Sequence, residues 1–175
     1  MKPLQVPQNL SMRLPCGCVL LMAIVVAVAG RADGEGSIPV ASDYVARGMQ
    51  RFRANRIAAS IDDFEHAAQL SPQMLPELWQ LGISYYYAGK YAAGQKQFEI
   101  HQRVNPHDVE NAAWHFICLA RVEGVEAARE RLLEIDTRRD TRVPMSEVYH
   151  FYAGQGTAKE VLAAADQDST ELSLI

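Results

Sequence analysis

The sequence predicts an all-α protein built from repeated helical units. The main observation is that the chain matches itself at an offset of 34 residues. Self-similarity at a fixed period of roughly 20 to 50 residues is typical of repeat proteins, in which each unit buries its apolar face against its neighbours. No stretch shows the apolar–polar alternation that predicts strands. The matching pairs are Gly48 with Gly82, Ser60 with Gly94, Phe64 with Phe98, and Pro72 with Pro106.

Hydrophobic periodicity and capping signals divide the repeat region into helices. Pro72 and Pro106 cannot continue a helix, so each is expected to close one unit. Asp108 is a candidate N-cap for the helix that follows it. Thr157 and Glu160 form a capping-box pattern ahead of the last helix. The expected helices cover residues 42–54, 58–70, 75–88, 92–104, 109–122, 125–135, 145–153 and 158–165.

The two best-defined units resemble tetratricopeptide (TPR) repeats, which are 34-residue helix–turn–helix units that stack into a solenoid. The resemblance implies an α–α superhelical solenoid of antiparallel helix pairs, with about three to four repeats. A third unit, 109–142, keeps the spacing better than the identities, and a short fourth pair from residue 143 is expected to cap the stack. The family's residue types stand at Leu81, Gly82, Tyr85, Gly94, Phe98 and Pro106 in the second unit, and at Gly48, Ser60, Phe64, Ala67 and Pro72 in the first.

The small residues of these units are expected to let paired helices approach closely. Gly48 and Gly82 would lie at the contact of the two helices of one unit, and Phe64 and Phe98 would fill the volume between units.

Several positions depart from the family pattern. Arg47 and Arg51 occupy positions at which large apolar residues are usual, which an end unit with one uncovered face tolerates. His101 stands where the family prefers a small residue. In the third unit Phe116 replaces the first small residue and Asp140 replaces the closing proline.

The first 29 residues look like a secretory signal peptide. Lys2 and Arg13 give a basic start, and the unbroken apolar run of residues 19–29 ends in the small-x-small pattern of a cleavage site. We therefore expect an exported protein, periplasmic or secreted. The alternative is an uncleaved anchor over residues 14–30, which is at the short limit for a membrane span.

The rest of the chain is expected to form a flexible linker (30–40), one repeat domain (41–165) and a disordered tail (166–175). Cys118 is the only cysteine beyond the predicted signal, so that part has no internal disulfide. The formal net charge of −4 argues against nucleic acid as a partner, because binding phosphates needs a cationic face. The sequence leaves the oligomeric state open.

In TPR proteins the first helix of each pair lines a concave groove that holds a peptide or protein segment. The resemblance therefore implies a non-enzymatic interaction scaffold or adaptor without a cofactor. Val45 and Met49 stand where carboxylate-clamping members have Lys or Asn, so the groove suits large apolar anchors, with an acidic group near Arg53 or Arg121. The expected groove residues are Met49, Phe52, Arg53, Trp79, Ile83, Tyr86, Tyr87, Ile117 and Arg121, with Val45, Ala113 and Ala120 at related positions.

Two alternatives remain open. An aromatic stripe at helical spacing is often part of a core, and at least one ring of Tyr85, Tyr86 and Tyr87 must point inward. A different class of function, ligand or metal binding or redox chemistry, could use Cys118, His115 and Trp114. The sequence lacks the motifs of a nucleophile or a phosphate loop, and its five histidines lack metal-ligand spacing, so we expect neither an enzyme nor a metal site.

Overall fold

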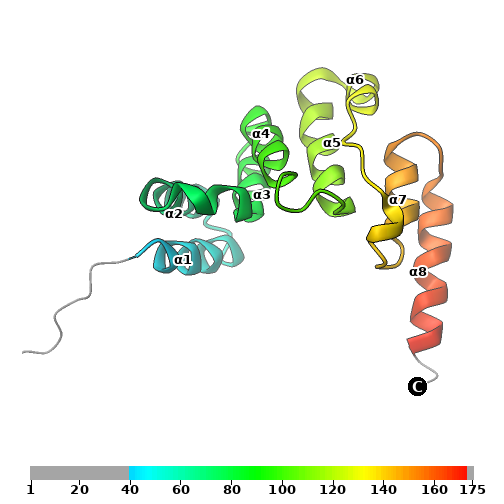
Figure 1. The fold of residues 1–175 in the computed structure, drawn as a ribbon, viewed down its shortest axis with the longest axis horizontal. Helices are drawn as coiled ribbons and strands as arrows, with labels where there is room; N and C mark the ends of the chain where they lie inside the picture. The colour runs from blue at the N-terminus through cyan, green and yellow to red at the C-terminus, as the bar shows by residue number, and fades with distance from the viewer. Residues whose placement is uncertain (1–39, 173–175) are drawn as a thin grey trace, which may run out of the picture. The chain divides into compact units, whose positions relative to one another are not determined.

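The computed structural model describes residues 40–172, with side chains up to residue 166, and this part of the chain is helical without strands (Figure 1). The all-α prediction is confirmed. The predicted signal peptide, all but the last residue of the predicted linker, and residues 173–175 lie outside the described residues.

Eight α-helices and two short 3-10 helices (η) make up residues 40–172. The α-helices pack in neighbouring pairs: α1 packs on α2, α3 on α4, α5 on α6 and α7 on α8, while α2–α3, α4–α5 and α5–α7 join the pairs. The elements are α1 (Ala41–Arg53), α2 (Ile57–Leu70), η1 (Pro72–Glu77), α3 (Trp79–Tyr87), α4 (Tyr91–His101), α5 (Val109–Glu123), α6 (Val125–Glu130), η2 (Thr137–Arg139), α7 (Met145–Tyr152) and α8 (Ala158–Leu172).

The close helix approach predicted at the glycines is confirmed. A Cβ atom on Gly48 would lie 2.8 Å from Cε1 of Phe64, and one on Gly82 would lie 2.6 Å from Cζ of Phe98. The two phenylalanines therefore fill the space inside their own units rather than only between units. Phe98 also reaches the next unit, where its ring stacks on Trp114 with centroids 6.2 Å apart.

Two contacts 34 residues apart join α2 to α3 and α4 to α5. The Ser60 hydroxyl lies 3.2 Å from that of Ser84. One period later, a Cβ on Gly94 would lie 2.9 Å from Sγ of Cys118. Small residues therefore stand at both of these contacts. The sequence predicted instead that Ser60 and Gly94 would allow close approach of the two helices within one unit, and for Gly94 this contact is also present, since an added Cβ would lie 3.1 Å from the Gly82 carbonyl oxygen.

The two arginines that depart from the family pattern share one partner. Arg47 Nη2 lies 2.6 Å from Asp63 Oδ1, and Arg51 Nη1 lies 2.9 Å from Asp63 Oδ2, with Asp63 buried. One period later these positions hold Leu81, Tyr85 and Gln97. Arg47, Arg51 and Asp63 therefore differ together from the equivalent positions of the next unit, because a buried carboxylate needs paired cations.

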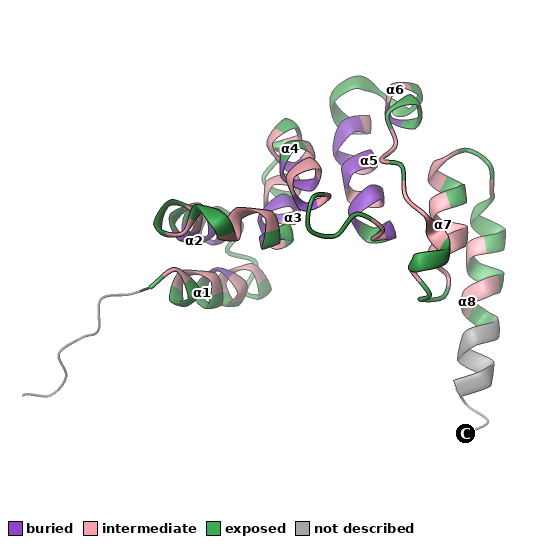
Figure 2. Ribbon diagram, in the orientation of Figure 1, coloured by how far each residue is buried: buried purple, intermediate pink, exposed green. Residues whose placement is uncertain are grey.

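Burial is concentrated in the middle of the described chain, and the purple segments of Figure 2 fall mainly on α2 to α5. One cluster of buried side chains joins Ile61 and Phe64 of α2 to Leu78 and Leu81 at the start of α3. A second joins α5 to α6 through Phe116, Leu119 and Ala128, with Tyr152 of α7 packed on it. In α7 no residue is fully buried.

Four predicted helix boundaries differ from the structure by three or more residues. The helix expected to end at residue 104 ends at His101. The helix expected over 75–88 is split into η1 and α3, and the one expected over 125–135 ends at Glu130. The last helix begins with the predicted capping box, in which Glu160 accepts a hydrogen bond from the Thr157 N–H at 2.7 Å. This helix continues to Leu172 and so covers part of the segment expected to be a disordered tail.

Candidate functional site

The structure places the predicted groove residues in three different surroundings. Met49 and Val45 pack against the cluster around Phe64, and Ile117 packs against the cluster around Leu119. Arg53 is exposed, whereas the guanidinium of Arg121 lies 4.8 Å from the Tyr91 ring and donates to its hydroxyl at 2.9 Å. The remaining predicted residues come together on one surface: Phe52, Trp79, Ile83, Tyr86 and Tyr87.

That surface holds an aromatic cluster, which we define as Phe52, Tyr86, Tyr87, Tyr91 and Trp114. Tyr87 lies 6.2 Å from Phe52 and 6.4 Å from Trp114, measured between ring centroids. Tyr86 lies 5.4 Å from Tyr91 and 5.5 Å from Trp114. Tyr87 keeps 61% of its surface exposed. Rings from α1, α3, α4 and α5 are thus brought together, and part of the cluster faces solvent.

The three consecutive tyrosines point in different directions. Tyr85 packs against the cluster around Phe64 and donates its hydroxyl to Glu65 at 2.8 Å. Burial is the main cause that raises the pKa of Tyr85 above its ordinary value, so its hydroxyl stays protonated. The prediction that at least one of these rings points inward is confirmed, and Tyr87 is the ring left exposed.

A cavity of about 480 Å³ lies between α3, α4 and α5, in the size range of pockets that hold small ligands or side chains. Trp79, with 43% of its surface exposed, and Trp114 are both part of its wall. These are the only two tryptophans of the chain. The apolar lining consists of Trp79, Ile83, Phe98, Val104 and Trp114, and the polar lining of Glu77, His101, Asn105, Asp108, Glu110 and Asn111.

His101 presents a hydrogen-bond acceptor to this cavity. Its Nδ1 lies 2.7 Å from the carbonyl oxygen of Pro76, and because a carbonyl only accepts, Nδ1 carries the proton. In the neutral ring Nε2 is then an acceptor, and it has no partner among the described residues. The side chain is 5% exposed, so this geometry is fixed by packing.

Asn111 has a side-chain oxygen without a partner. Its Nδ2 donates to the Phe98 carbonyl at 3.2 Å and to Oε1 of Gln102 at 2.8 Å. These two acceptors fix the orientation of the amide, because a flipped amide would place its oxygen against them. Oδ1 is then buried without a partner, in a residue only 2% exposed that lines the cavity.

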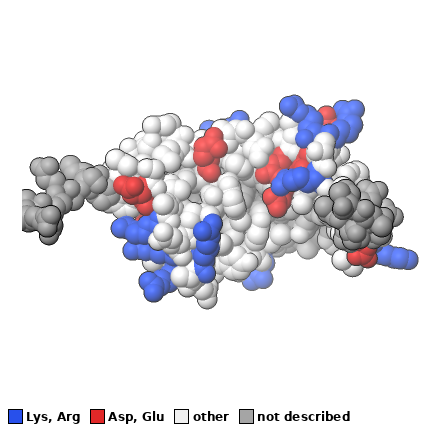
Figure 3. Space-filling model, turned by 90° about the horizontal axis from the view of Figure 1, so that it is seen from below, with Lys and Arg blue, Asp and Glu red and all other residues white. Residues whose placement is uncertain are grey.

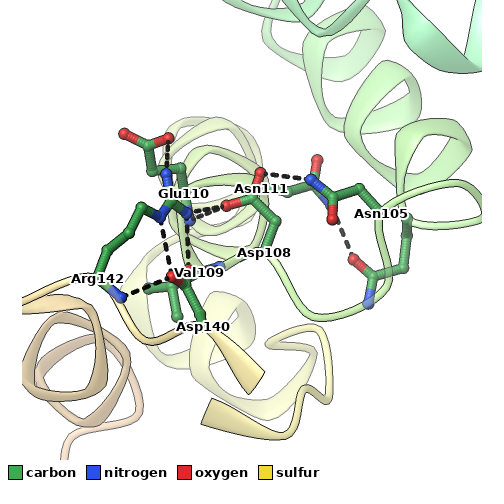
Figure 4. A network of polar contacts seen from close by, with 8 residues as sticks. Asn105, Asp108, Val109, Glu110, Asn111, Asp140 and Arg142 are labelled. Carbon is green, nitrogen blue, oxygen red and sulfur yellow. Dashed lines mark hydrogen bonds and ion pairs between the residues drawn. The ribbon is translucent and has the colours of Figure 1, made fainter. Parts of the chain in front are cut away.

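Two carboxylates of the cavity lining, Asp108 and Glu110, contact Arg142 in a polar network (Figure 4). Arg142 contacts Asp108 at 2.7 Å, Glu110 at 2.9 Å and Asp140 at 2.7 Å. Asp140 also accepts from the Val109 N–H at 3.1 Å, at the start of α5. The Arg142 guanidinium is the main cause that lowers the pKa of Asp140, and Asp140 is the first cause that raises the pKa of Arg142. One cation therefore faces three carboxylates.

The residues of the alternative function lie in the interior. Cys118 is fully buried, and burial raises the pKa of its thiol to about 12, which disfavours the reactive thiolate. Burial also lowers the pKa of His115, whose Nε2 lies 3.7 Å from Glu99. Nothing in the described part of the chain forms a group of three His, Cys, Asp or Glu side chains suited to a metal ion.

The predicted groove did not include three residues of this site, Trp114, His101 and Asn111, although Trp114 was named for the alternative function with Cys118 and His115. Trp114 stands one residue after a position that the family pattern assigns to the groove. The pattern therefore did not predict Trp114 itself as a groove residue. His101 did carry a signal, because it was the only departure from the family pattern in the second unit. Asn111 carried none, since an asparagine early in a helix is usually exposed.

The comparisons add no family. No protein-family model matches the sequence, and no curated protein is significantly similar to it. Between residues 40 and 172, no helix is both long and apolar enough to cross a membrane. The resemblance to TPR proteins therefore rests on the repeat residues alone.

Proposed function

We propose that this chain is a non-enzymatic interaction scaffold that binds a peptide or protein segment over the aromatic cluster and the adjoining cavity. In this proposal residues 41–165 stack as a TPR-like superhelix, and the N-terminal signal pattern directs the protein to the periplasm or beyond. The first helices of the repeats supply the contact side chains.

The observation that carries the proposal is the partial exposure of large aromatic rings beside a cavity. Tyr87 and Trp79 leave 61% and 43% of their surfaces in contact with solvent. Their neighbours Tyr86, Ile83 and Trp114 are only partly buried. Aromatic side chains of this kind dominate the binding free energy of protein interfaces, whereas a well-packed hydrophobic core would bury them.

Charge supports the choice of partner class. Uncharged atoms cover most of the described surface on the face drawn in Figure 3, and the charged side chains there form separate small groups. On that face the described residues present no continuous basic strip of the kind that binding a phosphate backbone requires. A peptide with apolar anchors suits such a surface better than a nucleic acid does.

The test begins with selection of random peptides displayed on phage against the full chain, followed by affinity measurements on one enriched peptide. Trp79→Ala combined with Tyr87→Ala should weaken its binding at least about tenfold, since interface hot spots contribute roughly 2 kcal/mol or more. Neither Trp79 nor Tyr87 is fully buried, so the double variant should fold.

A matched control removes exposed apolar side chains elsewhere. Phe151→Ala combined with Leu162→Ala changes two exposed residues of α7 and α8, away from the aromatic cluster. The peptide should bind this control like the unchanged chain. Equal affinity for all three proteins would exclude the aromatic cluster as the binding surface.

A further inference from the structure

The polar groups around the cavity are hydrogen-bond acceptors and negative charges. His101 Nε2 and Asn111 Oδ1 are acceptors without partners among the described residues. Glu77 makes no hydrogen bond or ion pair with any described residue, and its carboxylate is exposed. The residues that line the cavity include no Lys or Arg.

Arg142 does not cancel this negative charge. Its single guanidinium is shared among Asp108, Glu110 and Asp140, which leaves two negative charges in that group. Glu77 adds a third at the cavity wall. The charged residues in and next to the cavity lining therefore carry net negative charge.

The apolar wall favours the same ligand. Trp79 and Trp114 present indole rings, which attract a cation over their faces and stack on a planar guanidinium. Arginine offers five N–H donors, a permanent positive charge and a planar group that matches both carboxylates and aromatic faces. An acidic or phosphorylated ligand would meet repulsion here.

We propose that this cavity binds the guanidinium of an arginine side chain in the partner peptide, between Trp79, Trp114 and the carboxylate of Glu77. The inference rests on the proposed scaffold function and specifies the chemistry of its partner. It also changes the sequence expectation, which placed an acidic partner group near Arg53 or Arg121. Neither of those arginines lines the cavity.

The test uses N-acetyl-arginine amide as the probe and the full chain as the receptor. Both tryptophans of the chain lie in the cavity wall, so intrinsic fluorescence reports on this site without a label. N-acetyl-citrulline amide is the control ligand, because citrulline keeps the shape of arginine without its charge. Arginine amide should change the fluorescence in a saturable way and bind at least about fivefold more tightly than citrulline amide, a difference of the size of one solvent-accessible ion pair.

A substitution supplies the second arm. Glu77→Gln should weaken arginine amide about fivefold and leave citrulline amide unchanged, whereas Glu130→Gln on α6 should alter neither. Equal affinity for the two ligands, the absence of a saturable change, or indifference to Glu77→Gln would each overturn the proposal.

The two proposals fail differently. If a selected peptide loses affinity with Trp79→Ala plus Tyr87→Ala but is unaffected by Glu77→Gln and by citrulline in place of its arginines, the scaffold function stands and the arginine site is wrong. If the arginine probe binds as expected but no peptide depends on the aromatic pair, the cavity binds cations and the scaffold proposal fails.

Discussion

At the scale of single residues, the contact between paired helices leaves no room for an added atom at some glycines. Gly82 lies against the tip of the Phe98 ring, and Phe98 in turn is buried and stacked on Trp114. The ring cannot move away from an added methyl group without disturbing the next unit. The glycine is therefore required by packing, since its helical backbone would otherwise favour alanine.

Gly82→Ala should lower the free energy of unfolding by about 1–2 kcal/mol, because the strain of overpacking exceeds the gain of about 1 kcal/mol in helix propensity. Urea unfolding followed by circular dichroism measures the change. Combining it with Phe98→Leu, which removes the atoms in contact, should cost less than the sum of the two single changes. Additive costs would show that Gly82 and Phe98 do not share one tight contact.

Cys118 should be inert in the folded chain. Because burial raises its pKa to about 12, the thiolate is scarce at neutral pH, and the side chain is out of reach of reagents. Iodoacetamide labelling, read by mass spectrometry of the peptide that contains Cys118, should be slow in buffer and fast in denaturant. Fast labelling of the native chain would instead support the alternative function, in which Cys118 takes part in redox chemistry.

The raised pKa of Cys118 also predicts that the free energy of unfolding depends on pH. Above the unfolded-state pKa of about 8.5, the unfolded chain releases the Cys118 proton while the native chain keeps it. The unfolded state then binds fewer protons, so this residue's contribution to stability is complete below about pH 8.5 and is lost as the pH rises toward 12.

At the scale of secondary-structure elements, polar side chains decide where helices end. At η1 and the residue after it, three backbone carbonyls accept hydrogen bonds from side chains of α4. Gln97 donates to the Leu75 and Leu78 carbonyls at 2.8 and 3.1 Å, and His101 donates to the Pro76 carbonyl. After α6, the Leu133 carbonyl accepts from the Tyr149 hydroxyl at 3.1 Å. Carbonyls bound in this way are satisfied without an α-helix.

This explains which boundaries could be predicted from the sequence. The starts at Asp108 and Thr157 depend on local capping, and both are confirmed by hydrogen bonds within three residues. The shortened helix after Val125 depends on partners from distant elements, such as Gln102 and Tyr149. Residues 131–135 contain no Gly or Pro to announce a break, so periodicity alone predicted a longer helix.

The surface proposed to bind a peptide could be predicted from the sequence to a similar degree. Trp79, Ile83 and Tyr87 follow from the family's groove positions and lie where the aromatic cluster and cavity are found. Met49 and Ile117 stand at positions equivalent to Ile83, yet they pack on buried clusters. The polar lining depends on tertiary contacts of His101 and Asn111 that no local pattern reveals.

The connector between η2 and α7 gives an element-scale prediction. Arg142→Gln leaves Asp108 and the buried Asp140 without their cation at the start of α5. The free energy of unfolding should fall by about 1–2 kcal/mol, a modest value because the guanidinium is half exposed. Thermal or urea unfolding measures it.

Arg138→Gln is the matched control. Its ion pair with Asp136 joins residues two apart in the same connector, and the arginine is almost fully exposed. The change should cost less than about 0.5 kcal/mol. Equal effects of the two substitutions would mean that the Arg142 group does not anchor the connector to α5.

At the scale of the whole molecule, contacts between neighbouring helices predict uneven stability. Buried side chains gather in α2 to α5, whereas α8 packs on α7 and α7 has no fully buried residue. In such arrays local unfolding starts where neighbours are missing.

Hydrogen–deuterium exchange read by mass spectrometry should therefore show the fastest exchange among the described helices in α8, then α7, and the slowest in α3 to α5. The expected order follows from burial, because α7 has no fully buried residue, whereas α3, α4 and α5 each contain several. Uniform protection from α1 to α8 would indicate one cooperative core, contrary to this account.

The structure of the full chain bound to a selected peptide tests the central claim most directly. The account predicts that the peptide lies across Tyr87 and Trp79, with an arginine side chain in the cavity beside Glu77. A peptide bound to another face, with the aromatic cluster and cavity unoccupied, would contradict it.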